Sequence, residues 1–119
     1  RLAPSAGGLK AYTIIVVRNA EEKLALSSAA CGQDFVAHAP VVLVFLADEK
    51  RSADKYGIRG AKLFCVQDAT IAAAYAQLAA TDQGLATCWV GAFNEEAVAN
   101  VVGARSRLRP VALLPTGYA

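Results

Sequence analysis

Apolar runs alternate along the chain with polar stretches, and their lengths predict alternating strands and helices. Short runs rich in β-branched residues and bounded by Gly, Pro or Asn predict strands. Longer segments with apolar residues at helical spacing, preceded by Asn or followed by Gly, predict helices. The predicted strands are residues 12–17, 41–47, 85–90 and 110–114. The predicted helices are residues 20–31, residues 61–83, and a segment that Asn94 caps and that ends near Gly103.

Three features of this pattern bear on the architecture. The run 41–47 (VVLVFLA) does not alternate, so we expect a central strand covered on both faces. The stretch 48–60 carries seven charges in thirteen residues and predicts a solvated loop or a loose helix. In helix 61–83 the larger side chains recur at helical spacing, and alanines on the other side permit close packing. The element order alone favours an α/β arrangement with helices on both faces of the sheet.

Composition and charge exclude several classes of protein. The 119 residues are 55% apolar and 18% charged, with a net charge of +2, which excludes intrinsic disorder and provides no strong field for nucleic acid or an anionic membrane. The length predicts one domain, residues 1–119. Lys62 and Asp68 interrupt the longest apolar run, so we expect no membrane span. Gln67 and Asp68 are interpreted first as packing or interface groups.

Cysteine and histidine usage indicates neither a metal site nor a catalytic triad. Cys31, Cys65 and Cys88 lack metal-ligand spacing, and their odd number predicts reduced, buried thiols in a cytoplasmic protein. His38 is the only histidine, so a triad would have to use it, and a structural or exposed role is favoured. The chain contains no Met, from which we expect an N-terminal segment to be missing.

Three further segments have both a structural and a functional interpretation. Residues 3–9 (APSAGGL) form either an ordinary loop or a loop whose glycines let the backbone approach a flat ligand. Residues 87–93 end a strand at Gly91, and α/β proteins place ligands at such ends, although Gly91 also suits a plain turn. Arg105, Arg107 and Arg109 would suit a phosphate but are more often solvated.

Taken in order, these motifs resemble the nitroreductase-like family of FMN-dependent oxidoreductases, and the resemblance covers nearly the whole chain. The segments that carry it are APSAGGL (3–9), YTIIVV (12–17), GQDFVAHAPVVLVFLAD (32–48), KYGIRG (55–60), VQDATIAAAYAQLAATDQGLATCWVGAF (66–93) and PVALLPTGY (110–118). The resemblance implies a three-layer α+β fold. In that fold helices flank both faces of a mixed, mainly antiparallel central sheet.

The resemblance also implies an activity. Family members are homodimers with FMN at the interface, and they pass electrons from NAD(P)H through the flavin to a small acceptor such as a nitroaromatic or a quinone, by a ping-pong mechanism. Because the flavin carries the chemistry, no catalytic side chain and no metal are expected. Two alternatives stay open, a flavin-binding protein without turnover and a dehydrogenase of the same family that acts on peptide azolines.

The residues that match the family's cofactor-binding positions lie in three places. Pro4, Ser5, Ala6 and Gly8 match a loop that approaches the flavin from the partner subunit, and Lys10 stands where the family favours Gln, either near the ring edge or in solvent. Val90 and Gly91 match a strand end near the isoalloxazine, and Gln33 matches a region that contacts its pyrimidine edge. The family's phosphate contacts would lie upstream of Arg1 and beyond Ala119.

Overall fold

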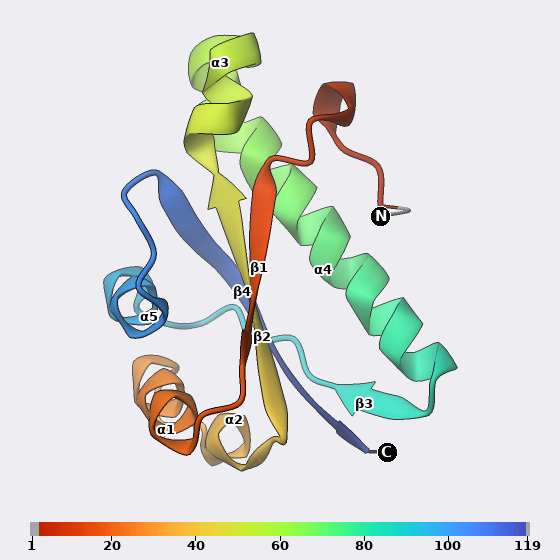
Figure 1. Cartoon of the computed structure of the whole chain (residues 1–119), viewed down its shortest axis with the longest axis vertical. Helices are drawn as coiled ribbons and strands as arrows, with labels where there is room; N and C mark the ends of the chain where they lie inside the picture. Colours follow the sequence, from red (N-terminus) through yellow and green to blue (C-terminus); the bar gives the residue numbers. More distant parts are fainter. Residues whose placement is uncertain (1–2, 119) are drawn as a thin grey trace.

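The sheet at the centre of the molecule has four strands, and every neighbouring pair is antiparallel (Figure 1). This computed structural model describes residues 3–118, and its strands lie in the order β1-β2-β4-β3. They are β1 (Tyr12–Val17), β2 (Val41–Asp48), β3 (Leu85–Thr87) and β4 (Leu108–Tyr118). The pairing confirms the α+β fold that the resemblance implies. The α/β arrangement that element order alone favours is wrong, because that order does not fix strand direction.

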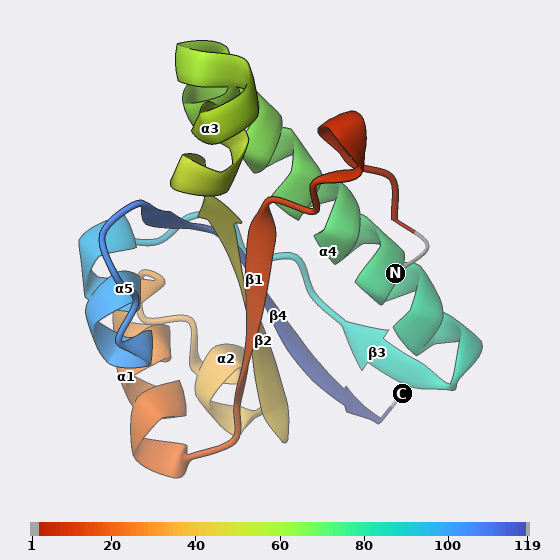
Figure 2. The same cartoon turned by 45° about the horizontal axis from the view of Figure 1, so that its top comes forward.

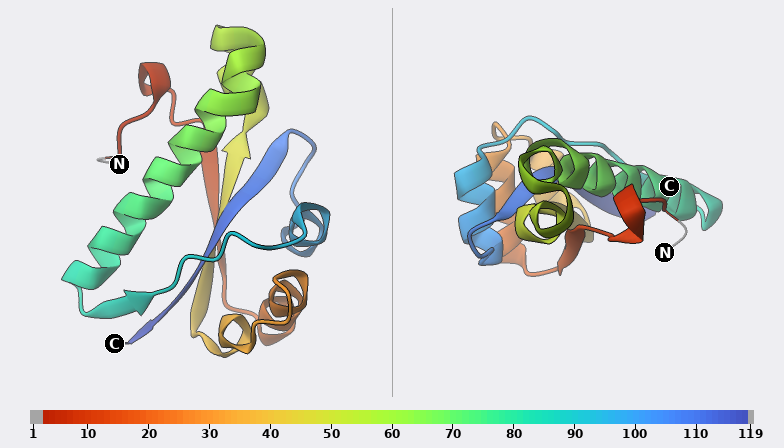
Figure 3. Two further views of the ribbon diagram at one scale, coloured as in Figure 1. Left: turned by 180° about the vertical axis from the view of Figure 1, so that it is seen from behind. Right: turned by 90° about the horizontal axis from the view of Figure 1, so that it is seen from above.

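Helices cover both faces of the sheet, which gives three layers (Figure 1). One face carries α1 (Ala20–Ala29), α2 (Asp34–His38) and α5 (Glu95–Val102), and the other carries α4 (Cys65–Asp82). After β2 the chain forms α3 (Glu49–Arg59) and a five-residue π-helical segment, Gly60–Phe64, before it enters α4. The segment between β3 and α5 crosses from the α4 side of the sheet to the α5 side (Figure 3).

The buried strand β2 contributes side chains to both layers, as its continuous apolar run predicts. Val42, Val44 and Leu46 pack with α1, α2 and α5. Phe45 and Ala47 point the other way and pack in the clusters that include α4. All five side chains are fully buried, so β2 forms the centre of the core.

The alanine-rich side of α4 faces the sheet, whereas larger apolar side chains of this helix remain exposed. The buried residues of α4 are Cys65, Asp68, Ala69, Ala72 and Ala73. Tyr75 and Leu78 are 42% and 69% exposed. The small side chains let the helix lie close to the strands, and the outward side leaves an apolar stripe on the surface.

β4 contains Pro110 and Pro115, and the sequence pattern predicts that the strand begins at the first and stops before the second. The structure extends the strand over Leu108–Tyr118, so the predicted bounds of 110–114 are wrong. Pro110 is accommodated beside a β-bulge at Val111, where the register with β2 shifts by one residue. The missing N–H of Pro115 falls beyond the end of β3, and the carbonyl of Pro115 accepts a hydrogen bond from the Cys88 N–H at 3.2 Å.

The two helix starts predicted from asparagine are confirmed. Asn19 Oδ1 accepts from the Glu22 N–H at 3.0 Å, and Asn94 Oδ1 accepts from the Ala97 N–H at 2.9 Å. α5 ends, as predicted, at Gly103, whose φ of 66° is left-handed.

The polar stretch 48–60 forms α3 and a tight hairpin with the helical segment after it. Gly57 interrupts α3 with φ 66° and ψ −144°, a conformation that glycine adopts far more readily than other residues. Gly60 packs directly on the backbone of Ser52, because a Cβ atom built on Gly60 would lie 2.5 Å from the Ser52 carbonyl oxygen. The two segments therefore pack so closely at Gly60 that a side chain there has no room.

The continuous helical stretch Glu49–Asp82 is long and apolar enough, by length and composition, to cross a membrane. Core helices of soluble proteins pass the same test, and one side of α4 packs on the sheet while its outward side stays exposed. The absence of a membrane span stays a prediction.

Candidate functional site

The N-terminal loop, residues 3–10, is closed by its own hydrogen bonds and lies beside the start of α4 (Figure 2). Ser5 is central to it: its Oγ accepts from the Lys10 N–H at 2.9 Å and its carbonyl accepts from the Gly8 N–H at 3.0 Å. Gly7 and Gly8 have φ values of 59° and 70°. A Cβ atom on Gly7 would also collide with the Tyr56 hydroxyl. The Gly pair is therefore required by the turn itself.

Asp68 of α4 anchors this loop. The residue is 2% exposed, and its Oδ1 accepts a hydrogen bond from the Ala6 N–H at 3.0 Å. Its second oxygen, Oδ2, is buried and has no hydrogen-bond partner among the described residues. The sequence interpretation as a packing group misses this contact, although one carboxylate on an otherwise apolar helix is a visible signal for it.

The loop and the start of α4 border an open pocket of about 560 Å³, which we call the loop pocket. Its lining residues are Pro4, Ser5, Ala6, Phe64, Val66, Gln67, Asp68, Thr70 and Ile71. Three of the predicted flavin-binding residues therefore line one cavity. Gly8 and Lys10 lie further along the same loop, and both are exposed.

Val90 and Gly91 lie where the chain leaves the sheet. Val90 is buried and forms an isolated bridge with Leu113, with both backbone hydrogen bonds at 3.0 Å. Gly91 is exposed, and a Cβ atom built there meets nothing closer than Trp89 Nε1 at 3.5 Å. The strand end is thus held firmly by Val90, while Gly91 presents open backbone.

Gly91 borders a second pocket of about 210 Å³, which we call the Gly91 pocket. It is lined by Val66, Gly91, Phe93, Glu95, Arg109, Pro110 and Val111. Val66, in the first turn of α4, lines both pockets, so the two groups of predicted site residues meet around the start of this helix. Arg109 donates to both carboxylate oxygens of Glu95 at 2.9 and 3.2 Å, and this contact raises the pKa of Arg109 above its ordinary value.

Gln33 is not brought together with the N-terminal loop within this chain. It lies between α1 and α2, in the layer on the opposite face of the sheet (Figure 1). Its side-chain Nε2 donates to the backbone carbonyl of Ala30 at 2.8 Å, and the backbone carbonyl of Gln33 accepts from Ser27 Oγ at 2.8 Å. These contacts give Gln33 a structural role at the corner between the two helices.

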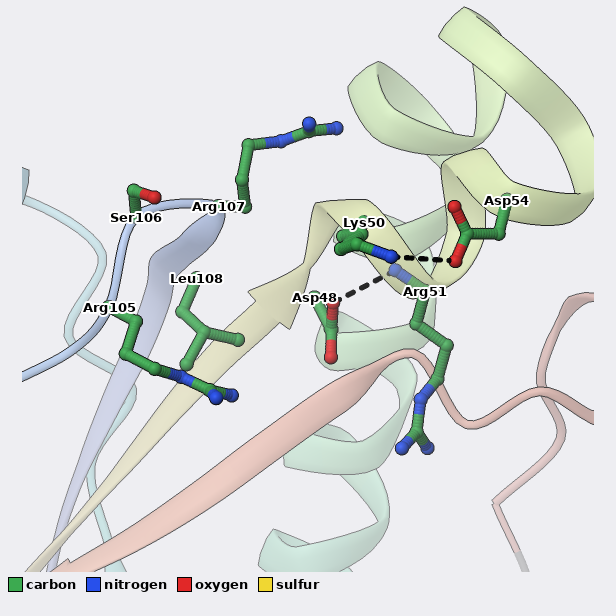
Figure 4. Close-up of a pocket in the computed structure, with 8 residues that line it drawn as sticks. All are labelled: Asp48, Lys50, Arg51, Asp54, Arg105, Ser106, Arg107 and Leu108. Carbon is green, nitrogen blue, oxygen red and sulfur yellow. Dashed lines mark hydrogen bonds and ion pairs between the residues drawn. The ribbon is translucent and has the colours of Figure 1, made fainter.

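A third, solvent-open pocket of about 480 Å³ lies between the start of α3 and the loop before β4 (Figure 4). Its cations are Lys50, Arg51, Arg105 and Arg107. Lys50 pairs with Asp54 at 3.1 Å and Arg107 pairs with Glu49 at 3.2 Å. In Figure 4 the arginine side chains point in different directions. Because two of the four cations are engaged in ion pairs and the arginine side chains do not converge, this pocket is a poor phosphate site.

The cysteines and the histidine supply no nucleophile to either pocket. Cys65 is buried, and burial raises the pKa of its thiol above the ordinary value. Cys31 and Cys88 are free but exposed, so the prediction that all three thiols are buried is wrong: both lie where the chain leaves an element, Cys31 just after α1 and Cys88 just after β3. His38 is exposed at the end of α2. The described residues contain no group of three His, Cys, Asp or Glu residues that would hold a metal.

This fold defines a class of α+β protein with two pockets at the start of one long helix, and comparisons with known proteins identify it further. The Nitroreductase family model matches residues 24–118. An "NADH dehydrogenase" of Thermus thermophilus is 34% identical, over 98% of this chain and 70% of that protein. A relative from Methanocaldococcus jannaschii is 31% identical over 89% of this chain and 52% of its own length.

Solved structures of similar proteins agree. The NfrA1 nitroreductase of Bacillus subtilis has a TM-score of 0.88 at 27% identity, over 98% of this chain and 53% of that one. An FMN-dependent nitroreductase of Clostridium difficile has a TM-score of 0.80 at 27% identity, over 99% of this chain and 69% of that one. The chain belongs to the nitroreductase family, and it spans about half the length of two of these relatives.

Proposed function

We propose that the protein is an FMN-dependent oxidoreductase that takes electrons from NAD(P)H and passes them, by a ping-pong mechanism, to a small electrophile such as a nitroaromatic or a quinone. The observation that carries the proposal is the family match over residues 24–118, combined with the loop pocket formed by Pro4, Ser5 and Ala6. We place the activity in the cytoplasm, where the three free thiols would stay reduced.

The residues present fit the ring of a flavin. The loop pocket has a volume in the range of small-molecule sites, and Gly91 offers exposed backbone with no side chain in the way. Arg109, which borders the Gly91 pocket, is engaged in an ion pair with Glu95, so we expect the phosphate contacts to come from residues other than those that line the two pockets. Bound FMN would supply hydride acceptance and transfer, while the protein would bind and orient its ring.

Each predicted site residue has a definite part in this proposal. Pro4, Ser5, Ala6 and Gly8 would approach the flavin of the partner subunit, and Lys10 would place a cation at the edge of the ring. Val90 would hold the strand end from which Gly91 faces the ring. Gln33 would contact the pyrimidine edge, for which its side chain would have to leave the Ala30 carbonyl.

A homodimer accounts for apolar surface that the single chain leaves exposed. Beside α4, Ile14 and Val16 of the edge strand β1 are 44% and 46% exposed, and Tyr75 and Leu78 lie on the outward side of the helix. A groove of about 280 Å³ between these two elements is lined by apolar residues that include Ile14 and Tyr75. A second copy of the chain that covers this surface would remove it from water.

The absorbance spectrum of the purified protein tests the proposal. Oxidised flavin should be visible, and NADH or NADPH should bleach it until a quinone or a nitroaromatic restores the colour. Flavin that binds but is not bleached would leave a binding protein without turnover. Protein that is colourless and takes up no added FMN would overturn the assignment as a whole.

Gly91→Ala tests the role of the strand end. The structure has room for the added methyl group, so the fold should be retained while a ring against this backbone is pushed away. We expect FMN affinity, measured by quenching of flavin fluorescence, to fall about five- to thirtyfold, since one lost close contact of about 1–2 kcal/mol has that effect. Gly103→Ala is the matched control: it strains a left-handed cap with no atom nearby, so it should lower stability and leave FMN affinity unchanged.

A further inference from the structure

Two cations on one face of α3 are turned towards the N-terminal loop. Arg51 and Lys55 are one helical turn apart on this helix, so they share one face. Arg51 Nη1 donates to the carbonyls of Leu9 and Lys10, both at 3.4 Å. In Figure 4 the Arg51 side chain accordingly points away from Arg107 and does not join the other arginines of that pocket.

Lys55 lies against the tip of the same loop. A Cβ atom built on Gly7 would be 3.0 Å from Lys55 Nζ, so the ammonium group lies beside this turn. The same Nζ is 5.5 Å from the centroid of the Tyr56 ring, which is a cation–π contact. Both cations are therefore held by neutral groups, carbonyls for Arg51 and a ring for Lys55, and these groups leave the positive charge uncompensated.

The carboxylates close to this pair have other partners. Within the described part of the chain, neither Arg51 nor Lys55 forms an ion pair with a carboxylate. Asp54 pairs with Lys50 at 3.1 Å, and Asp48 Oδ1 accepts from the Arg51 backbone N–H at 2.9 Å. Two like charges one turn apart destabilise a helix because they repel each other. The pair would therefore be stabilised by an anion bound between α3 and the loop.

The same loop joins this pair to the site proposed for the flavin. Residues 4–6 line the loop pocket, and residues 7–10 carry the contacts to Arg51 and Lys55. Asp68, beneath the loop, is 2% exposed and its Oδ1 is bonded to the loop backbone. An anion held by the pair would thus lie beside the flavin site, a few residues further along the loop.

We propose that Arg51 and Lys55 bind the pyrophosphate of the hydride donor, NADH or NADPH, while its nicotinamide meets the flavin. The proposal rests on the proposed function for the identity of the donor. In both dinucleotides a single ribose separates the pyrophosphate from the nicotinamide, so the pyrophosphate remains near the reacting ring. The extra phosphate of NADPH lies further away, on the adenosine. Arginine and lysine bind phosphate through charge-assisted hydrogen bonds.

Three hydride donors test the proposal on the FMN-loaded protein: NADH, NADPH and N-benzyl-dihydronicotinamide, which has the same reacting ring but no phosphate. Stopped-flow bleaching of the flavin gives the half-saturating concentration and the limiting rate for each donor. In Lys55→Gln and in Arg51→Gln, we expect the half-saturating concentrations of NADH and NADPH to rise about three- to tenfold, the range for a charged contact at an exposed site. The values for the benzyl donor and all limiting rates should stay unchanged.

Lys62→Gln is the matched control. It removes the same charge from an exposed lysine of the neighbouring helical segment, but Lys62 lines a different pocket, with Glu95 and Glu96. All three donors should therefore be as effective as with the wild type. FMN affinity should also be unchanged in Lys55→Gln and Arg51→Gln. A fall in that affinity would assign the pair to the phosphate of the flavin and overturn the proposal.

A binding measurement makes the test independent of flavin and of reduction. Titration calorimetry should show that the wild type binds ADP, which carries a diphosphate, more tightly than adenosine. The difference should shrink about three- to tenfold in Lys55→Gln. Equal affinities of the wild type for ADP and adenosine would overturn the proposal.

The donor series separates this inference from the proposed function. A loss that the benzyl donor shares would show that the pair only holds the loop, and a loss confined to NADPH would assign the pair to the extra phosphate. Either result would overturn the proposal. Flavin that all three donors reduce equally well in the wild type and the variants would refute this inference alone. Flavin that no donor reduces would refute the proposed function, and the ADP titration would still decide on the pair.

Discussion

Replacing Gly60 with alanine tests the tight hairpin between α3 and the helical segment that follows it. Gly60 has helical backbone angles, φ −63° and ψ −48°, so helix propensity by itself predicts that alanine stabilises the protein by about 1 kcal/mol. The structure predicts the opposite sign. A Cβ atom at this position would lie 2.5 Å from the carbonyl oxygen and 2.8 Å from the carbonyl carbon of Ser52.

The clash involves backbone atoms, so no rotation of a side chain relieves it. Overpacking of this kind costs about 1–3 kcal/mol and more where the backbone must move, which outweighs the gain in propensity. We expect Gly60→Ala to lower the free energy of unfolding by about 1–2 kcal/mol, and the melting temperature by several degrees for a chain of this size.

Urea titration followed by circular dichroism measures this change. Gly91→Ala, where the nearest atom lies 3.5 Å from the new methyl group, is the matched control and should change stability little. Ser52→Ala combined with Gly60→Ala should not restore stability, because the clashing oxygen belongs to the backbone. A Gly60→Ala protein as stable as the wild type would show that α3 is not packed in this way.

Other substitutions test the core, a helix cap and the thiols. Leu113→Ala should lower the free energy of unfolding by about 2–5 kcal/mol, because this buried side chain of β4 fills the layer beneath α1 and α5. Denaturant titration measures the change, and a smaller loss would show that this layer is loosely packed. Asn94→Ala should cost about 1 kcal/mol by removing the cap of α5, with Asn94→Asp as the variant that keeps it. Ellman's reagent should label Cys31 and Cys88 in the native protein, and Cys65 after unfolding only. Because the native pKa of Cys65 is raised, the native state binds more protons than the unfolded state as pH rises through about 9, so stability should fall there, and a Cys65→Ala protein should lack that fall.

The sequence predicts those features of the fold that depend on a few neighbouring residues, such as helix starts and strand bounds. The asparagine caps at Asn19 and Asn94 fix two helix starts, and the β-branched run of β1 fixes its bounds. The direction of the strands depends on contacts between distant segments, and the pattern of single elements does not contain it. The ends of β4 could not be predicted for the same reason. A β-bulge accommodates Pro110, and Pro115 lies beyond the end of β3, so neither proline ends the strand.

The candidate site is divided in a similar way. The glycines of the N-terminal loop and Gly91 are visible as motifs, because backbone turns require them. The link between Asp68 and Ala6 joins residues 62 positions apart, so no local pattern reveals it. Gln33 matches a family motif, but its side-chain amide donates to the Ala30 carbonyl at the corner between α1 and α2. A sequence match does not detect this contact.

The bulge at Val111 also has a consequence for how this strand tolerates insertions and deletions. With the extra residue in place, Leu108 points into the layer of α1 and α5, and Arg109 lies opposite Ala47 and borders the Gly91 pocket. Deleting Val111 would shift everything before it by one position, so that leucine and arginine would exchange faces. An arginine would then enter an apolar layer. In an alignment of relatives, a gap misplaced by one residue at this bulge would likewise assign Leu108 and Arg109 to the wrong faces of the sheet.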